Sequence, residues 1–68
     1  MAEQHVIDTI LNHDNKKGNW TYLVRWYGQH ISADSWEPLS RLPRNTLIAY
    51  HKREHLKLPD EIYKAIIG

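Results

Sequence analysis

Two histidines, His51 and His55, stand four residues apart, a spacing that places two metal ligands on one face of a helix. A metal site needs a third ligand, but Glu54 falls off that line and the other histidines are scattered along the chain. The sequence also has no phosphate-binding loop, no G-x-S-x-G and no H-E-x-x-H. We therefore expect no metal, no cofactor, no catalytic residue and no enzymatic activity. The two histidines are interpreted as titratable residues on a helix, one of them packed against a sheet.

Aromatic rings offer a second kind of chemistry, because they can hold a cation or stack on a nucleic-acid base. The chain has no Phe, so three Trp and four Tyr supply all its aromatic volume. Trp36, in the run Trp36-Glu37-Pro38, is interpreted as a packing residue that fixes a strand against a helix. Trp20 stands beside a turn, where it covers the sheet or stacks on a partner.

Positive charge is concentrated in residues 41–57, where five basic side chains stand against one acidic side chain, Glu54. The basic residues are Arg41, Arg44, Lys52, Arg53 and Lys57. A block of this kind suits contact with phosphate or with an acidic surface, and it is also typical of a solvated helix face. We keep both interpretations, and the five residues are the candidate contacts to DNA or RNA.

The chain of 68 residues is expected to form one small domain of marginal stability, and because it contains no cysteine it has no disulfides to stabilise it. The absence of cysteine favours a reducing compartment, the cytosol or the nucleus. No apolar run approaches the roughly 20 residues of a membrane-spanning helix, so we expect no membrane partner.

Three strands are predicted in the first half of the chain. Residues 5–12 alternate imperfectly, which indicates a bulge, and a turn at 14–19 follows, with Gly18 at its positive φ. Residues 20–27 form the strongest strand, and residues 35–37 form a short third strand that ends at a proline. Alternation places Trp20, Tyr22, Val24 and Trp26 on one face of the second strand. The residues between them lie on the other face, and because Leu23 there is also apolar, both faces are expected to be partly covered.

The pattern changes to helix after Pro43. Asn45 is the predicted N-cap of a helix over residues 46–57, which covers the sheet with its first two turns. Leu58-Pro59 ends this helix, and residues 60–67 are predicted to form a second short helix that begins with two acidic residues. The sequence therefore predicts a small α+β domain, a three-stranded antiparallel sheet closed by a C-terminal helix.

These residues resemble a chromodomain. The resemblance rests on the runs Tyr22–Gly28 (YLVRWYG) and Ser35–Pro38 (SWEP) with seven residues between Gly28 and Trp36, and on the apolar pairs around them. It covers residues 4–57, which leaves 58–68 as a C-terminal extension. The family fold, a curved three-stranded sheet with a C-terminal helix packed across it, agrees with the elements predicted above. The segment WEPLSRLPRNTLIAYHKR is most similar to chromodomains of gypsy-type LTR retroelement integrases and polyproteins.

The resemblance implies binding of a methylated lysine on a histone tail, which is held as an added strand with the methylammonium in a cage of three aromatic rings. The matching cage positions here are His5, Trp26 and Gln29, so only Trp26 matches, and the loop acid that assists the cation falls at Ala33. Weak or methyl-independent binding is therefore expected. We also hypothesise that protonation of His5 below about pH 6 weakens binding to a methylammonium.

The peptide-pairing strand implied by the resemblance comprises Glu3, Gln4, Val6 and Ile7. The expected partner is a histone tail or another chromatin protein, in the nucleus. One alternative is nucleic-acid binding through residues 41–57. A second is a self-associating module with a weak dimer face at Ile62, Ile66 and Ile67.

Overall fold

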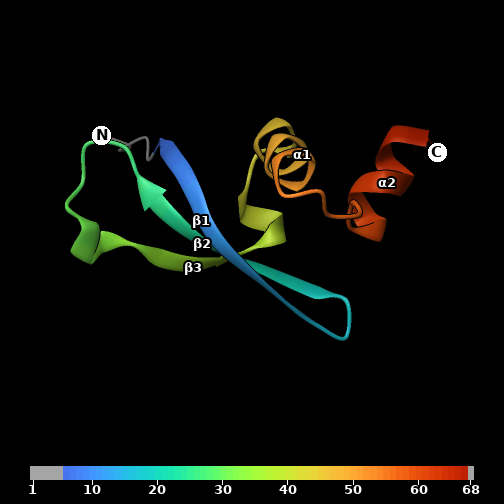
Figure 1. Cartoon of the computed structure of the whole chain (residues 1–68), viewed down its shortest axis with the longest axis horizontal. Coiled ribbons are helices and arrows are strands. Elements are labelled where there is room, and N and C mark those ends of the chain that lie inside the picture. The colour runs from blue at the N-terminus through green and yellow to red at the C-terminus, as the bar shows by residue number, and fades with distance from the viewer. Residues whose placement is uncertain (1–5, 68) are drawn as a thin grey trace.

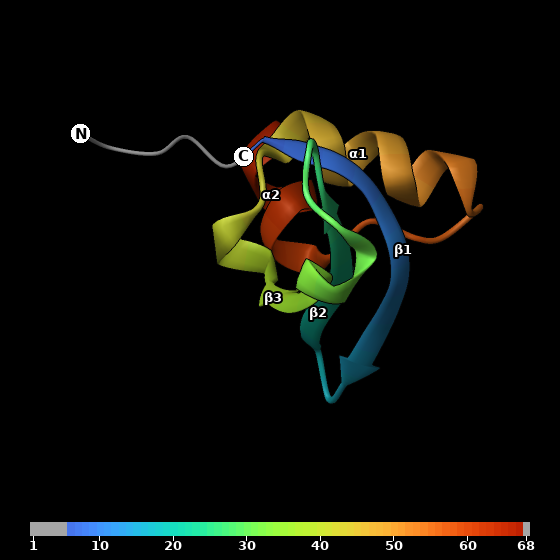
Figure 2. The same cartoon turned by 90° about the vertical axis from the view of Figure 1, so that its left-hand side faces the viewer.

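The computed structural model describes residues 6–67. Its main elements are β1 (Ile7–Lys16), β2 (Asn19–Trp26), β3 (Ser35–Pro38), α1 (Arg44–Arg53) and α2 (Asp60–Ile67). The three strands form one antiparallel sheet in the order β1-β2-β3. Helix α1 lies across one side of the sheet with α2 beside it, and β1 is bent along its length (Figures 1 and 2). The predicted fold class, a curved sheet with a C-terminal helix across it, is confirmed.

The β1–β2 hairpin has a tighter turn than the sequence suggested. The strands extend to Lys16 and from Asn19, so that Lys17 and Gly18 alone form the turn, with φ angles of 54° and 85°. Two consecutive positive φ angles match the right-handed twist of a hairpin, which explains why no longer loop is needed. Register shifts interrupt the ladder twice along the first half of β1, which confirms the predicted bulge and accounts for the bend.

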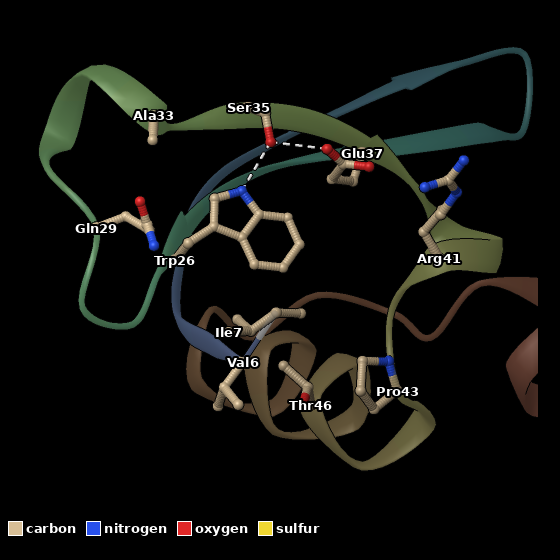
Figure 3. A pocket seen from close by; sticks show the side chains of 10 residues that line it. All are labelled: Val6, Ile7, Trp26, Gln29, Ala33, Ser35, Glu37, Arg41, Pro43 and Thr46. Atoms are coloured by element: carbon tan, nitrogen blue, oxygen red, sulfur yellow. Dashed lines mark hydrogen bonds between the residues drawn. The ribbon is translucent and has the colours of Figure 1, made fainter. Parts of the chain in front are cut away.

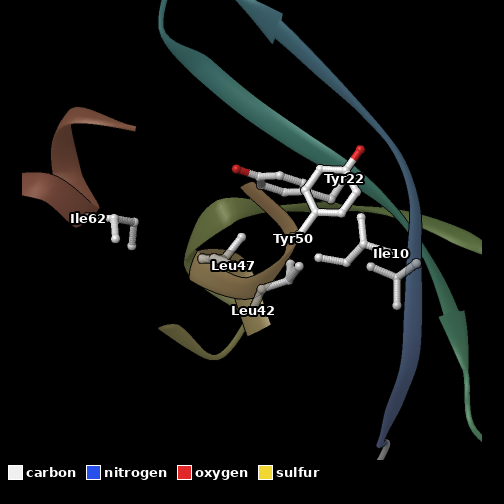
Figure 4. Close-up of a cluster of buried hydrophobic side chains, with 7 residues drawn as sticks. Ile10, Tyr22, Leu42, Leu47, Tyr50 and Ile62 are labelled. Atoms are coloured by element: carbon white, nitrogen blue, oxygen red, sulfur yellow. The ribbon is translucent and has the colours of Figure 1, made fainter. Parts of the chain in front are cut away.

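The core lies where α1 crosses β1 and β2 (Figure 4). It consists of Ile10, Tyr22, Val24, Leu42, Leu47, Tyr50 and Ile62, with partly buried residues around it. Tyr22 and Val24 alternate along β2 and are fully buried, and Trp20 and Trp26 pack against the same cluster. The prediction that these four side chains share one face of β2 is therefore confirmed, and the structure shows that this face is the core face. Trp20 covers the core, with its ring stacked on that of Tyr22 at a centroid distance of 6.2 Å.

Trp36 does not pack between sheet and helix, so that prediction is wrong. Its side chain is 51% exposed. Trp36 pairs with Leu23, whereas Ser35 and Glu37 pair with the buried residues Val24 and Tyr22. Directly opposed residues share a face, so strand alternation turns Ser35 and Glu37 inward and Trp36 outward. Backbone pairing with β2 holds the third strand in place.

One polar side chain, His51, is buried at 0% exposure in the core. Its Nδ1–H donates to the carbonyl of Lys57 at 3.1 Å, and its Nε2 accepts from the hydroxyl of Tyr22 at 2.7 Å. A carbonyl can only accept, so the proton of the neutral ring sits on Nδ1. Burial is the main cause that lowers the pKa of His51 below its usual value, which keeps the ring neutral.

Both ends of α1 differ from the prediction. The helix begins at Arg44, and the carbonyl of Pro43, not the side chain of Asn45, accepts the first helical bond from the N–H of Leu47 at 3.1 Å. The helix ends at Arg53 because His55 adopts a φ of 56°. The N–H groups of His55 and Leu56 then bond back to the carbonyls of Lys52 and His51, which is a Schellman motif.

The buried His51 predicts that the domain loses stability in mild acid. A lowered pKa means that the unfolded chain binds the proton first, so the free energy of unfolding is highest above about pH 6.5 and falls as the pH drops through the folded-state pKa. Urea unfolding at pH 7.5 and pH 5 measures this loss. His51→Gln removes the titrating ring and should flatten the profile, while the exposed control His55→Gln should leave it unchanged. An equally steep profile in His51→Gln contradicts the assignment.

The positive φ of His55 predicts a stabilising substitution. His55→Gly should raise the free energy of unfolding by about 1 kcal/mol, because glycine adopts the left-handed conformation without the clash of a Cβ atom. His55→Ala is the control, since alanine keeps the Cβ and removes only the imidazole. Chemical denaturation distinguishes the two. Equal stabilisation by both variants would show that the imidazole, not the backbone, carries the cost.

Candidate functional site

An open cavity of about 770 Å³ lies between the start of β1 and the segment that leads from β3 into α1 (Figure 3). Its lining residues are Val6, Ile7, Trp26, Gln29, Ala33, Ser35, Glu37, Arg41, Pro43 and Thr46. Val6 and Ile7 come from the start of β1. The other lining residues come from the part of the chain that runs from the end of β2 to the first turn of α1. The floor combines apolar groups with one carboxylate and one guanidinium.

The indole of Trp26 is held by a short relay of hydrogen bonds at this cavity. Its Nε1–H donates to Ser35 Oγ at 2.9 Å, and the Ser35 hydroxyl donates to Glu37 Oε2 at 2.7 Å (Figure 3). A serine hydroxyl has one proton, and because that proton goes to the carboxylate, its lone pairs are left for the indole N–H. The relay fixes the orientation of the ring and places a carboxylate beside it.

The loop between β2 and β3 is anchored on the outer side of the sheet. Arg25 donates twice to the carboxylate of Asp34, through Nε at 3.2 Å and Nη2 at 2.8 Å. At the start of the loop, Gly28 has a φ of 77° and the N–H of Gln29 bonds back to the carbonyl of Trp26 at 3.2 Å. A forked ion pair and a tight turn together keep the loop in one conformation, which places Gln29 and Ala33 at the cavity.

Several residues predicted from the sequence come together here. Trp26, Gln29, Val6 and Ile7 all line the cavity, as does Ala33 at the position of the loop acid. The N–H of the residue after Trp26 bonds to the carbonyl of Val6 at 2.8 Å, so the start of the chain is tied to the end of β2. The other predicted members, His5, Glu3 and Gln4, lie outside the described residues.

Ser35 and Glu37 were missed as site residues. The signal that could have found them is the parity of β3, since residues opposite Tyr22 and Val24 must face the concave side of the sheet. Placing Trp36 inward reversed that parity and turned both polar side chains outward. Pro43 and Thr46, also at the cavity, stand at the start of a helix whose beginning the sequence placed too late.

The basic residues of the 41–57 segment do not form a single surface of free side chains. Arg41 lines the cavity, and Arg53 donates through Nη2 to the carbonyl of Ile10 at 3.1 Å and pairs with Glu54. Arg44, Lys52 and Lys57 are exposed. The candidate nucleic-acid contacts are therefore divided between the cavity, the edge of the sheet and the solvent.

Two other predicted groups of residues, the dimer face and the histidine pair, are also divided in the structure. Ile62 is buried in the core, so the proposed dimer face keeps only Ile66 and Ile67, which are 52% and 64% exposed. His51 and His55 do not share a helix face, because α1 ends before His55. Within residues 6–67 no group of three metal-binding side chains gathers, and no helix is long and apolar enough to cross a membrane.

The fold and the cavity define a class of protein: a small binding module in which a bent three-stranded sheet, crossed by a C-terminal helix, presents a tryptophan beside its first strand. A sequence model of the Chromo (CHRromatin Organisation MOdifier) domain matches residues 5–53. The chain belongs to this family.

Relatives outside the family model agree with this assignment. The chain is 35% identical over 54 residues to the Chromo domain-containing protein cec-1 of Caenorhabditis elegans, an alignment that covers 78% of this chain and 18% of that protein. It is 40% identical over 52 residues to Chromobox protein homolog 2 of Homo sapiens, covering 74% and 10% of the two chains. It is 44% identical over 41 residues to Chromodomain Y-like protein of Rattus norvegicus, covering 60% and 7%. The chain thus spans less than a fifth of each of these relatives.

The relay predicts that Ser35 controls the environment of the Trp26 indole. Ser35→Ala should shift the Trp26 Nε1–H resonance upfield and lower the free energy of unfolding by about 1 kcal/mol, because the hydrogen bonds from Trp26 to Ser35 and from Ser35 to Glu37 are both lost. Ser35→Thr keeps the hydroxyl and should retain the resonance. Proton–nitrogen NMR spectra of both variants measure this. A resonance unmoved in Ser35→Ala rules out the relay.

Proposed function

We propose that the chain is a non-enzymatic chromatin-targeting module that holds an extended segment of a histone tail, or of another chromatin protein, as an added strand. The observation that carries this proposal is the cavity itself, which joins the start of an edge strand to an oriented tryptophan and a carboxylate. Such a module works in the nucleus. No chemistry beyond binding is asked of its residues.

Backbone pairing supplies the affinity in this proposal. β1 lies at one edge of the sheet, with β2 as its neighbour, so its other side has main-chain groups that an extended peptide can bond. Val6 and Ile7 bring that edge to the wall of the cavity. A peptide that pairs there places alternate side chains in the cavity, where Trp26 lies.

Side-chain recognition in the cavity is expected to favour a cation modestly. A methylammonium over one indole face gains roughly 0.5–1 kcal/mol, and a full cage gains more because it removes water from several sides. Gln29 and Ala33 provide no second ring and no loop acid, but Glu37 supplies a negative charge close to Trp26. We therefore expect a methylated tail to be preferred by less than about tenfold, since tenfold corresponds to about 1.4 kcal/mol.

The proposal has two finer parts, the parent protein and an alternative ligand. The parent protein is proposed to be a retroelement integrase or polyprotein, on the resemblance of the segment that runs from Trp36 to Arg53. Nucleic-acid binding is the alternative to tail binding, and it is supported by the exposed side chains of Arg44, Lys52 and Lys57.

A residue-resolved NMR titration tests the proposal. The labelled domain receives a trimethyl-lysine histone-tail peptide, its unmethylated twin and a short duplex DNA in separate experiments. Both peptides should shift the amides of Val6 and Ile7 and the indole of Trp26, with the methylated one binding slightly more tightly. Trp26→Ala should remove the methyl preference, while Trp36→Ala, a matched change on the outer face, should keep it.

Other outcomes assign a different function. If neither peptide shifts the cavity residues while DNA shifts Arg44 and Lys52 with an affinity that falls steeply with salt, the domain binds nucleic acid and the tail proposal is wrong. A preference for the methylated peptide far above tenfold would show that the reduced cage still acts as a full one.

A further inference from the structure

Open space continues along the edge of β1 beyond the Trp26 cavity. A second cavity, of about 410 Å³, lies between Ile7–Ile10 of β1 and the exposed side of α1. It shares Ile7 and Thr46 with the first cavity, so the two are contiguous. At its far end lies Arg53, in the last turn of α1. A strand added at the start of β1 would have a path in this direction.

Arg53 already forms a hydrogen bond with a backbone carbonyl on that path. Its Nη2–H donates to the carbonyl oxygen of Ile10 at 3.1 Å, and the hydroxyl of Thr9 lies 3.5 Å from the same oxygen. Ile10 pairs with Val24 of β2, and its carbonyl is bonded by a side chain from α1. The hydrogen bond from Arg53 is charge-assisted. It is therefore stronger than the hydrogen bond that a backbone N–H of an added strand would donate to the same carbonyl.

The guanidinium is held in this position from two further directions. Its carbon lies 5.1 Å from the centroid of the Tyr50 ring, and its Nε–H donates to Glu54 Oε2 at 3.0 Å. Tyr50 is itself buried in the core. An incoming strand would therefore have to break a cation–π contact and an ion pair as well as the bond to Ile10.

We propose that Arg53 is a stop for strand addition on β1. An extended chain pairs with the edge over Val6–Thr9 and ends before Ile10, which limits the length of the paired segment. Without the stop, the occupant of the continued edge is a second copy of this chain, since an exposed strand edge pairs readily with another such edge. The limit on peptide length rests on the proposed function; the protection against self-pairing does not.

The stop is specific to the forked side chain of arginine. Lysine at this position keeps the positive charge but has a single point donor, and it cannot bond Ile10 and Glu54 at once with one rigid planar group. Lys52, the preceding residue, is exposed and provides a charge-matched control on the same helical turn.

The experiment compares wild type, Arg53→Ala, Arg53→Lys and Lys52→Ala by sedimentation velocity over a wide concentration range. Arg53→Ala and Arg53→Lys should self-associate at least about tenfold more tightly than wild type, because a pairing strand no longer has to displace the charge-assisted hydrogen bond from Arg53 to Ile10. Lys52→Ala should sediment as wild type. The lysine variant decides the outcome if the alanine variant unfolds.

A second measurement follows the tail peptides on the same variants. In wild type the amide shifts along β1 should end before Ile10, and in Arg53→Lys they should continue to Leu11. Wild-type sedimentation of both arginine variants, together with an unchanged set of shifted amides, overturns the stop. If no variant binds a tail but the arginine variants self-associate, the stop holds and the proposed tail binding fails.

Discussion

The hydrogen bond from the Tyr22 hydroxyl to His51 connects the three parts of this domain. Tyr22 belongs to β2, His51 to α1, and the other nitrogen of the imidazole bonds the carbonyl of Lys57 in the segment that leads to α2. A chain of this size buries only about 60% of its unfolded surface, so each buried polar group must be fully bonded to be tolerated. Both nitrogens of His51 have partners, and burial lowers its pKa so that the ring stays neutral. The position of α1 over the sheet follows from this contact.

That position also determines where the sheet is left uncovered. Ile10, Tyr22 and Val24 form one cluster of buried side chains with Leu47 and Tyr50 of α1. Figure 4 shows this cluster, with Ile10, Tyr22, Leu47 and Tyr50 labelled. Trp26, at the far end of β2, is only partly covered and lines a cavity instead. The polar relay from Trp26 through Ser35 to Glu37 fills the concave face where apolar packing ends. The core and the cavity thus share one strand, with Val24 in the core and Trp26 at the cavity.

The sequence predicted the fold well because its strongest signals are periodic. Alternation placed Tyr22 and Val24 on the same face of β2, and Gly18 identified the turn. The errors have a common physical origin: a short element, or the end of an element, contains too few residues for the spacing of its apolar side chains to show which side faces the core or where the element ends. β3 has four residues, so the large Trp36 was placed inward, although pairing with β2 decides its side. The end of α1 depends on a left-handed His55, for which the sequence has no glycine as a marker.

At the candidate site, the sequence predicted those residues whose side-chain type and position in the motif were enough to suggest a role. Trp26 could be found from its position, but Ser35 and Glu37 act through a geometry that requires the register of β3. Arg53 was assigned to phosphate by its charge, yet its fork bonds the backbone of β1, a contact between residues far apart in the chain. In the proposed function, a cavity to which the described residues contribute one indole ring and one carboxylate would obtain most of its affinity from the peptide backbone. Its selectivity would then depend on where pairing begins and ends, which makes the edge of β1 as important as the cavity.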